Sequence, residues 1–183
     1  MKSMLVSLCA VSMIAGSTFA QELVVNGGFE TGDFTGWTQF GDTGSTGVDN
    51  TDDFFGIPAP QGVMAGYFGP SNAAGGIRQV LTANAGEQMT LTFQLALLDT
   101  ENNGFSVVLD GVLLMSIVNG MEQPFTSYSF TVTLANSNPT LSFAFYNPPS
   151  YHLLDAVSAT VPTPGAAAAL SLAGMTAFRR RRR

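Results

Sequence analysis

Residues 89–97 read MTLTFQLAL, with an apolar side chain at every second position. Successive side chains of a β-strand point to opposite faces of a sheet, so this alternation predicts a strand with one buried face. Residues 128–134, YSFTVTL, and residues 141–145, LSFAF, alternate in the same way. The three stretches therefore predict antiparallel sheets with one face on a core and the other toward water.

Asp110 and Gly111 separate two further apolar runs, residues 105–109 and 112–118. An Asp-Gly pair in this position favours a two-residue hairpin turn, in which both central residues need positive φ. Other short strands are predicted at residues 23–26, 62–68, 77–82 and 153–160. Because residues 21–160 show no helical periodicity, we expect one all-β domain, a two-sheet antiparallel β-sandwich of the jelly-roll type.

The alternation also predicts which side chains form the core. These are Leu91, Phe93, Leu95, Phe130, Val132, Phe143 and Phe145. We expect Phe34 and Trp37 to be buried as well, since large rings gain the most from leaving water. Residues 38–60 are rich in Gly and Asp without alternation, which predicts an irregular loop or a loosely held strand.

Charge and cysteine content exclude several classes of function. All thirteen acidic residues lie between Glu22 and Asp155, where Arg78 is the only basic residue. So acidic a surface repels nucleic acid and anionic lipid, and we expect no nucleic-acid partner. The only cysteine, Cys9, precedes the predicted domain, which therefore has no disulfide and no thiolate nucleophile.

Residues 1–20 have the layout of a secretory signal peptide. Lys2 precedes an apolar stretch, and the small residues Thr18 and Ala20 occupy the third and first positions before Gln21. We expect cleavage after Ala20, so that residues 21–160 form the exported domain. A secretory signal predicts passage through the inner membrane by the secretion machinery.

Residues 161–183 predict a sorting tail. Pro162-Thr163-Pro164 precedes an apolar stretch, residues 165–178, and five arginines end the chain. As a helix the apolar stretch would be about 21 Å long, short of the roughly 30 Å hydrocarbon core of a bilayer. The arginines would stay on the cytoplasmic side, which fixes the orientation of the tail.

This layout resembles the PEP-CTERM sorting signal, although Thr163 stands where that family usually has Glu. The resemblance implies processing by an exosortase, transient contact with the inner membrane, and a final location outside the cell, at its surface or in the extracellular matrix. The residues of the motif would be Pro162, Thr163, Pro164, Arg179, Arg180, Arg181, Arg182 and Arg183. A plain C-terminal tail anchor without processing is the alternative.

Residues 23–38, LVVNGGFETGDFTGWT, resemble the N-terminal signature of galactose-binding-like jelly rolls, which include several carbohydrate-binding module families. Residues 153–158, LLDAVS, resemble the last strand of that fold, with Ala156 in place of a second Asp. The resemblance implies a structural calcium ion held by the Gly28 carbonyl and the side chains of Glu30 and Asp155. Calcium takes six to eight oxygen ligands in irregular geometry. Alternatively, both carboxylates only cap turns or accept backbone N–H groups.

Several other side chains are candidates for ligand contact. Tyr146 and Tyr151 flank residues 147–150, NPPS, a loop that two prolines stiffen, and the two rings could form a platform for a sugar. The alternative is that they cover the edge of the sandwich. We expect a structural role for His152, the only histidine, and a carboxylate partner or a ligand for Arg78.

The sequence has no serine elbow, no phosphate-binding glycine loop and no zinc-protease motif, so we expect no enzyme. The leading hypothesis is an exported surface or extracellular-matrix protein whose sandwich binds polysaccharide without catalysis. One alternative is a structural matrix protein that binds no ligand. The other is a glycoside hydrolase that uses paired carboxylates, such as Asp52 with Asp53 or Asp99 with Glu101.

Overall fold

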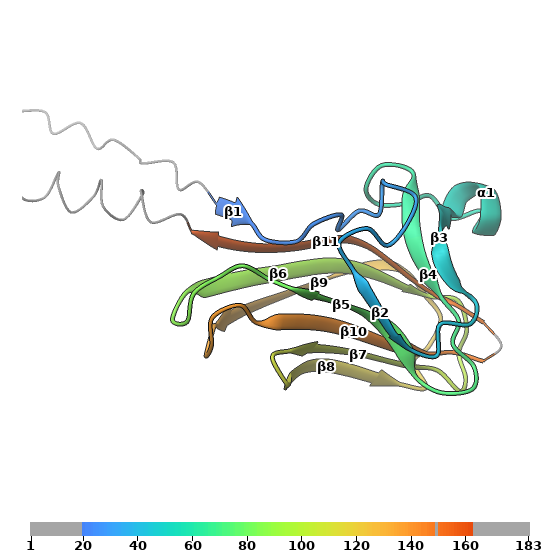
Figure 1. Cartoon of the computed structure of the whole chain (residues 1–183). Coiled ribbons are helices and arrows are strands. Elements are labelled where there is room, and N and C mark those ends of the chain that lie inside the picture. Colours follow the sequence, from blue (N-terminus) through green and yellow to red (C-terminus); the bar gives the residue numbers. More distant parts are fainter. Residues whose placement is uncertain (1–19, 149, 163–183) are drawn as a thin grey trace, which may run out of the picture. The chain divides into compact units, whose positions relative to one another are not determined.

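The computed structural model describes residues 20–148 and 150–162, which form two antiparallel sheets packed face to face (Figure 1). This architecture confirms the predicted all-β sandwich. The predicted signal helix and the apolar C-terminal helix, with Thr163, Pro164 and the arginines, lie outside the described residues. Within the described part of the chain, no helix has the length and apolar character needed to cross a membrane.

The first sheet has six strands, in the order β3-β4-β11-β6-β9, and β1 also pairs with β11. Its strands are β1 (Ala20–Glu22), β3 (Thr46–Asn50), β4 (Met64–Phe68), β6 (Gln88–Leu97), β9 (Gln123–Thr133) and β11 (His152–Pro162). Strand β4 pairs with residues 152–154 of β11, and β1 pairs with residues 160–162. The side of β11 opposite β6 is therefore shared between two short partners.

The second sheet has five strands, in the order β2-β5-β10-β7-β8. They are β2 (Thr38–Gly41), β5 (Gly75–Val80), β7 (Gly104–Leu109), β8 (Val112–Val118) and β10 (Thr140–Tyr146). Strands β7 and β8 form the predicted hairpin, with φ of 49° at Asp110 and 82° at Gly111. Positive φ at both residues is what a tight turn between twisted strands requires.

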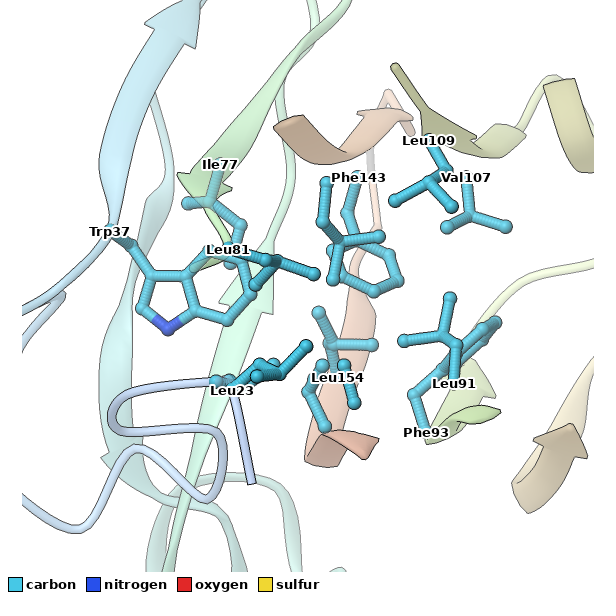
Figure 2. Close-up of a cluster of buried hydrophobic side chains, with 14 of the residues drawn as sticks. Leu23, Trp37, Ile77, Leu81, Leu91, Phe93, Val107, Leu109, Phe143 and Leu154 are labelled. Carbon is cyan, nitrogen blue, oxygen red and sulfur yellow. The ribbon is translucent and has the colours of Figure 1, made fainter. Parts of the chain in front are cut away.

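The core lies between the two sheets, whose inward side chains point toward one another (Figure 2). Phe93 of β6 meets Phe143 of β10 edge to face, with ring centroids 5.2 Å apart, and Phe68 of β4 stacks on Phe145 at 3.9 Å. Five of the seven predicted core residues are fully buried, namely Leu91, Phe93, Leu95, Phe143 and Phe145. Phe130 and Val132 are only half-buried, because β9 is the last strand of its sheet and has no neighbour on one side.

The structure corrects the prediction of an irregular loop or a loosely held strand at residues 38–60. This stretch contains β2, β3 and a short helix, α1 (Thr51–Phe55). The Asn50 side chain accepts hydrogen bonds from the Asp52 and Asp53 amides, and Gly56 ends the helix with φ of 68°. Such caps let even a five-residue helix form.

The predicted strand at residues 23–26 is also absent. Asn26 has φ of 55°, and the backbone of residues 23–27 forms only isolated hydrogen bonds with β11, from the Leu23 amide to Ala159 and from the Val157 amide to Gly27. Beyond it, the predicted core residue Trp37 is buried, and its indole N–H donates to the Asn26 carbonyl at 3.1 Å. Phe34 is partly buried against the same core.

Candidate functional site

Two carboxylates from distant parts of the sequence hold one loop. The Glu30 carboxylate accepts hydrogen bonds from the amides of Val63 (3.1 Å) and Met64 (2.9 Å). The Asp155 carboxylate accepts from the Gln61 amide at 2.7 Å and from the Ala156 amide at 2.6 Å. The two predicted calcium ligands therefore converge on residues 61–64.

The backbone of this loop approaches its neighbours very closely. Gly62 has φ of 66°, and a Cβ at this position would collide with the Glu30 carboxylate. A Cβ at Gly28, the third predicted ligand, would lie 2.7 Å from the Gln61 side chain. Gly28, Glu30 and Asp155 thus surround the same few residues, which sequence separation alone could not establish.

Asp155 is an unusual carboxylate because it is fully buried. The pKa of this group is raised to about 7, mainly by burial; the hydrogen bonds from Gln61 and Ala156 lower the pKa, and the nearby Glu30 charge adds a smaller rise. The only Lys or Arg in residues 20–162, Arg78, lies over the Phe40 ring, with 5.9 Å between its guanidinium carbon and the ring centroid. A buried carboxylate beside another carboxylate gains from either a proton or a cation.

This arrangement fits an oxygen-ligated calcium ion. No group of three or more His, Cys, Asp or Glu side chains that could hold a metal occurs among residues 20–148 and 150–162. A calcium site here would therefore combine the two carboxylates with carbonyl oxygens, such as that of Gly28, which calcium accepts readily. The hydrogen bonds from the loop amides also show that each carboxylate has a structural role as an acceptor.

The structure does not bring Tyr146 and Tyr151 together into one platform. Tyr151 belongs to an aromatic cluster with Phe54, Phe55 and Tyr67, in which the Tyr67 and Tyr151 ring centroids are 5.8 Å apart. This cluster lies at α1 and β4, beside the six-stranded sheet. Tyr146 lies at the end of β10, in the five-stranded sheet.

Tyr146 borders a hollow on the outward face of the five-stranded sheet. The hollow has a volume of about 200 Å³ and is lined by residues of β7, β8 and β10. Small side chains form much of the lining, because Ala144 of β10 pairs with Ser106 of β7, which in turn pairs with Ser116 of β8. Gly104 pairs directly with Tyr146 and leaves space beside the ring. One tyrosine ring and two serine hydroxyls therefore lie in the same hollow.

The same face continues across β5 and β2. Arg78 is exposed and pairs with Thr38 on one side and with Ser142 on the other. Its contact with the Phe40 ring replaces the carboxylate partner that the sequence predicted for it, and among the described residues no carboxylate forms an ion pair with it. The outward face of this sheet thus offers a cation, hydroxyls and two aromatic rings.

Gln79 is an important residue that the sequence did not single out. Although buried, it makes three hydrogen bonds: its side-chain oxygen accepts from the Val25 amide at 2.8 Å, and its side-chain nitrogen donates to the carbonyls of Val25 and Gly36. It therefore fastens residues 25–36 to β5. A glutamine on the same strand face as Ile77 and Leu81 is a weak sequence signal, because its hydrogen-bond partners lie more than forty positions away.

His152 is fully buried beside the rings of Phe105 and Phe145. Burial lowers its pKa to about 4, so the imidazole is neutral at physiological pH. Neither of its ring nitrogens has a hydrogen-bond partner among the described residues. This environment agrees with the predicted structural role.

Solved structures confirm the fold. TmCBM61 in complex with beta-1,4-galactotriose aligns with a TM-score of 0.60 at 16% identity, over 76% of this chain and 97% of that chain. The CBM22-1 xylan-binding domain from Paenibacillus barcinonensis aligns with a TM-score of 0.51 at 15% identity, over 83% of this chain and 99% of that chain. Both are carbohydrate-binding module domains, and the likeness shows that this chain shares their jelly-roll fold.

An enzyme is also among the similar structures. The enzymatically active domain of bacteriophage CBA120 tailspike protein 4 aligns with a TM-score of 0.58 at 14% identity, over 76% of this chain but only 21% of that chain. No known protein family and no curated protein matches the sequence. At these identities the structural likeness establishes the fold alone.

Proposed function

We propose that this protein binds polysaccharide, without catalysis, in the hollow beside Tyr146 on the five-stranded sheet. The observation that carries the proposal is the hollow itself, in which one aromatic ring lies beside small side chains and two serine hydroxyls. Sugars are recognised by apolar contact of a ring face with an aromatic side chain and by hydrogen bonds to their hydroxyl groups.

The rest of this face favours an extended glycan over a single sugar. Arg78, Thr38 and Ser142 continue the polar surface beyond the hollow, and Phe40 adds a second partly buried ring. The fold likeness to TmCBM61, solved with beta-1,4-galactotriose, and to a xylan-binding domain supports the same class of ligand. β-Linked polysaccharides are therefore the first ligands to test.

The test is a panel of immobilised polysaccharides, including galactan and xylan, probed with the full-length chain. Tyr146→Ala should weaken binding about tenfold or more, as expected for an aromatic anchor. Tyr151→Ala is the matched control and should bind like the wild type, because its ring lies in the cluster beside the other sheet. If polysaccharide binding depended on Tyr151 and not on Tyr146, the binding site would lie away from the hollow. Absence of any binding would favour the purely structural role, and release of free sugar would favour the hydrolase.

We also propose that Gly28, Glu30 and Asp155 hold one structural calcium ion. The motivating observation is the buried Asp155 carboxylate, which lies near Glu30 without a basic side chain in contact.

An ion bound only by the folded state raises stability by about 2.7 kcal/mol at a hundredfold excess over its dissociation constant. EDTA should therefore lower the melting temperature, and calcium should restore it. Glu30→Gln should remove this response, whereas Glu122→Gln, an exposed control, should keep it. A wild-type melting temperature that EDTA leaves unchanged would exclude the ion.

For the two ends of the chain, we propose export and exosortase sorting, with the protein reaching the cell surface or extracellular matrix. The sheet reaches both predicted processing regions, since Ala20 of β1 pairs with Pro162 of β11. Cleavage after Ala20 would leave Gln21 and Glu22 paired with Val161 and Thr160. Mass spectrometry of surface-extracted protein is the test. An N-terminus at Gln21 and a C-terminus near Pro164 would support the proposal, and a chain that ends in Arg183 would contradict sorting.

A further inference from the structure

Two long strands lie at one lateral side of the sandwich. Strand β8 is the last strand of the five-stranded sheet, and β9 is the last strand of the six-stranded sheet. Only residues 119–122 separate them in the chain, so the two sheets end next to each other. We call this side the open margin. Figure 1 shows β8 along the outer edge of its sheet.

The backbone of β8 is free on its outer side. Within the described residues, its only strand partner is β7, and no other backbone hydrogen bond involves residues 112–118. A free strand edge presents unpaired N–H and C=O groups that can pair with another strand. Natural proteins usually protect such an edge with charges, proline, a bulge or a covering segment.

Strand β8 has little of this protection. Its sequence, VLLMSIV, has no charged residue and no proline, and the bulge is confined to its first half, near Leu113 and Met115. Its Leu113 side chain is 60% exposed and its Val118 side chain 76% exposed. Glu122 is the only Asp, Glu, Lys or Arg between Asp110 and Asp155. An exposed, uncharged, apolar edge strand of seven residues is a pairing site.

The structure points to a second copy of this chain as the partner, and we infer that two copies pair antiparallel along β8. An antiparallel pair of identical strands is self-complementary, as a twofold contact requires. Within residues 20–162, eleven acidic residues lie outside the open margin and away from the buried Asp155, against Arg78 as the only Lys or Arg, which makes two copies repel each other. The open margin is the part of the surface where this repulsion is weakest, so the charge distribution favours a contact between copies there.

Pairing along β8 would join the two five-stranded sheets into one continuous sheet. The hollow beside Tyr146 is partly lined by β8, so two hollows would then lie on the same joined face. Two sites on one face can engage one polysaccharide strand with higher avidity than a single site. This consequence rests on the proposed glycan binding, whereas the pairing itself does not.

Sedimentation analysis of the full-length chain, over a wide concentration range and without glycan, tests the pairing. The wild type should show a reversible monomer–dimer equilibrium. Leu113→Lys places a charge on each copy at the contact and should raise the dissociation constant about tenfold or more. Val80→Lys is the matched control, since Val80 is 61% exposed, against 60% for Leu113, but lies in β5, inside the sheet. It should dimerise like the wild type.

Amide hydrogen exchange locates the contact independently of any substitution. Protection of residues 112–118 in the wild type should rise with protein concentration, while residues 38–41 of β2, the other edge of the same sheet, should not respond. A monomer at all concentrations would overturn the inference. An equal loss of association in both lysine variants, or in neither, would also overturn it, because the contact would then lie elsewhere. If association occurs as expected but no variant binds any glycan, the pairing stands and the proposed function fails.

Discussion

The two lateral sides of the sandwich are built differently. At the closed margin, which consists of β2, β3 and the segments that pack beside them, the strand edges are short or covered. Strand β2 has four residues, α1 follows β3 directly, and residues 23–37 fill the space beside β11. At the open margin, β8 has seven residues and β9 has eleven, and among the described residues no segment pairs with their outer sides.

Polar side chains hold backbone groups at both margins. Glu30, Asp155 and Gln79 all accept amides of segments at the closed margin. At the open margin, the buried Asn103 side chain accepts from the Gly120 amide at 2.8 Å and donates to the Gly120 carbonyl at 2.9 Å. Gln123 bonds to the Leu95 carbonyl only at 3.3 Å. The covering segments of the closed margin should therefore depend on a few buried polar contacts, while the outer sides of β8 and β9 should tolerate substitution and respond to association instead.

The largest difference is expected between two glycine substitutions. A Cβ at Gly27 would collide with the Val157 carbonyl, so Gly27→Ala forces the covering segment away from β11 and should destabilise the protein by about 3 kcal/mol or more. At the open margin, Gly111→Ala meets no atom and only strains a turn residue with φ of 82°, which costs about 1 kcal/mol. Denaturant unfolding of both variants measures the difference, and equal losses would contradict the comparison.

A smaller difference is expected between two glutamines. Gln79→Ala leaves the Val25 amide and two carbonyls without their partner in a buried place, which should cost about 2 kcal/mol. Gln123→Ala removes hydrogen bonds of a half-buried side chain and should cost under about 1 kcal/mol. Amide exchange should also quicken at residues 25–36 in the first variant alone. If Gln79→Ala is as mild as Gln123→Ala, the covering segment is held by its apolar contacts instead.

The smallest effect concerns pH. The folded pKa of Asp155 is raised to about 7 from 3.8, so the folded state binds the proton more tightly, and stability falls as pH rises through 7. The folded pKa of His152 is lowered to about 4 from 6.5, so its contribution to stability is complete only well above pH 6.5 and is lost as pH falls through 6.5 toward 4. Between pH 8 and pH 6.5 Asp155 contributes a gain of about 0.8 kcal/mol and His152 a loss of about 0.4 kcal/mol, which predicts a net gain of about 0.4 kcal/mol on acidification.

This gain should be measured by thermal unfolding in EDTA, where no cation can keep Asp155 charged. Asp155→Asn should turn the gain into a loss of about 0.4 kcal/mol, and His152→Gln should raise the gain to about 0.8 kcal/mol in this window. In excess calcium the gain should also disappear in the wild type, because a bound cation keeps the carboxylate ionised. A gain that persists in Asp155→Asn would assign the titration to another group.

Local sequence patterns were enough to predict much of this fold. Alternation along residues 89–97 and 141–145 identified β6 and β10, and the Asp-Gly pair located the β7–β8 hairpin. These predictions succeed because strand periodicity and turn chemistry depend on neighbours along the chain. The prediction failed at residues 38–60, where polar residues cap a helix and short strands rely on their partners in the sheet.

The candidate sites were predicted in part. The residues Gly28, Glu30 and Asp155 do converge, as the resemblance implied, on a loop that the sequence did not single out. Tyr146 and Tyr151 separate, although they are only five positions apart, because β10 and β11 belong to different sheets. The serines of the hollow could be assigned to an outward face, but nothing local shows that their strands are neighbours.

The sequence by itself therefore determined the all-β class, most strand positions and the acidic surface. Only the tertiary structure decided which strands are edges, which outward side chains share a hollow, and which carboxylate is buried. The physical reason is that alternation encodes the face to which a side chain points, with a period of two residues, but not the neighbour of a strand. The neighbours of a strand depend on packing between residues that are distant in the chain. Phe130 and Val132 are an example, because they are only half-buried on β9, the last strand of its sheet.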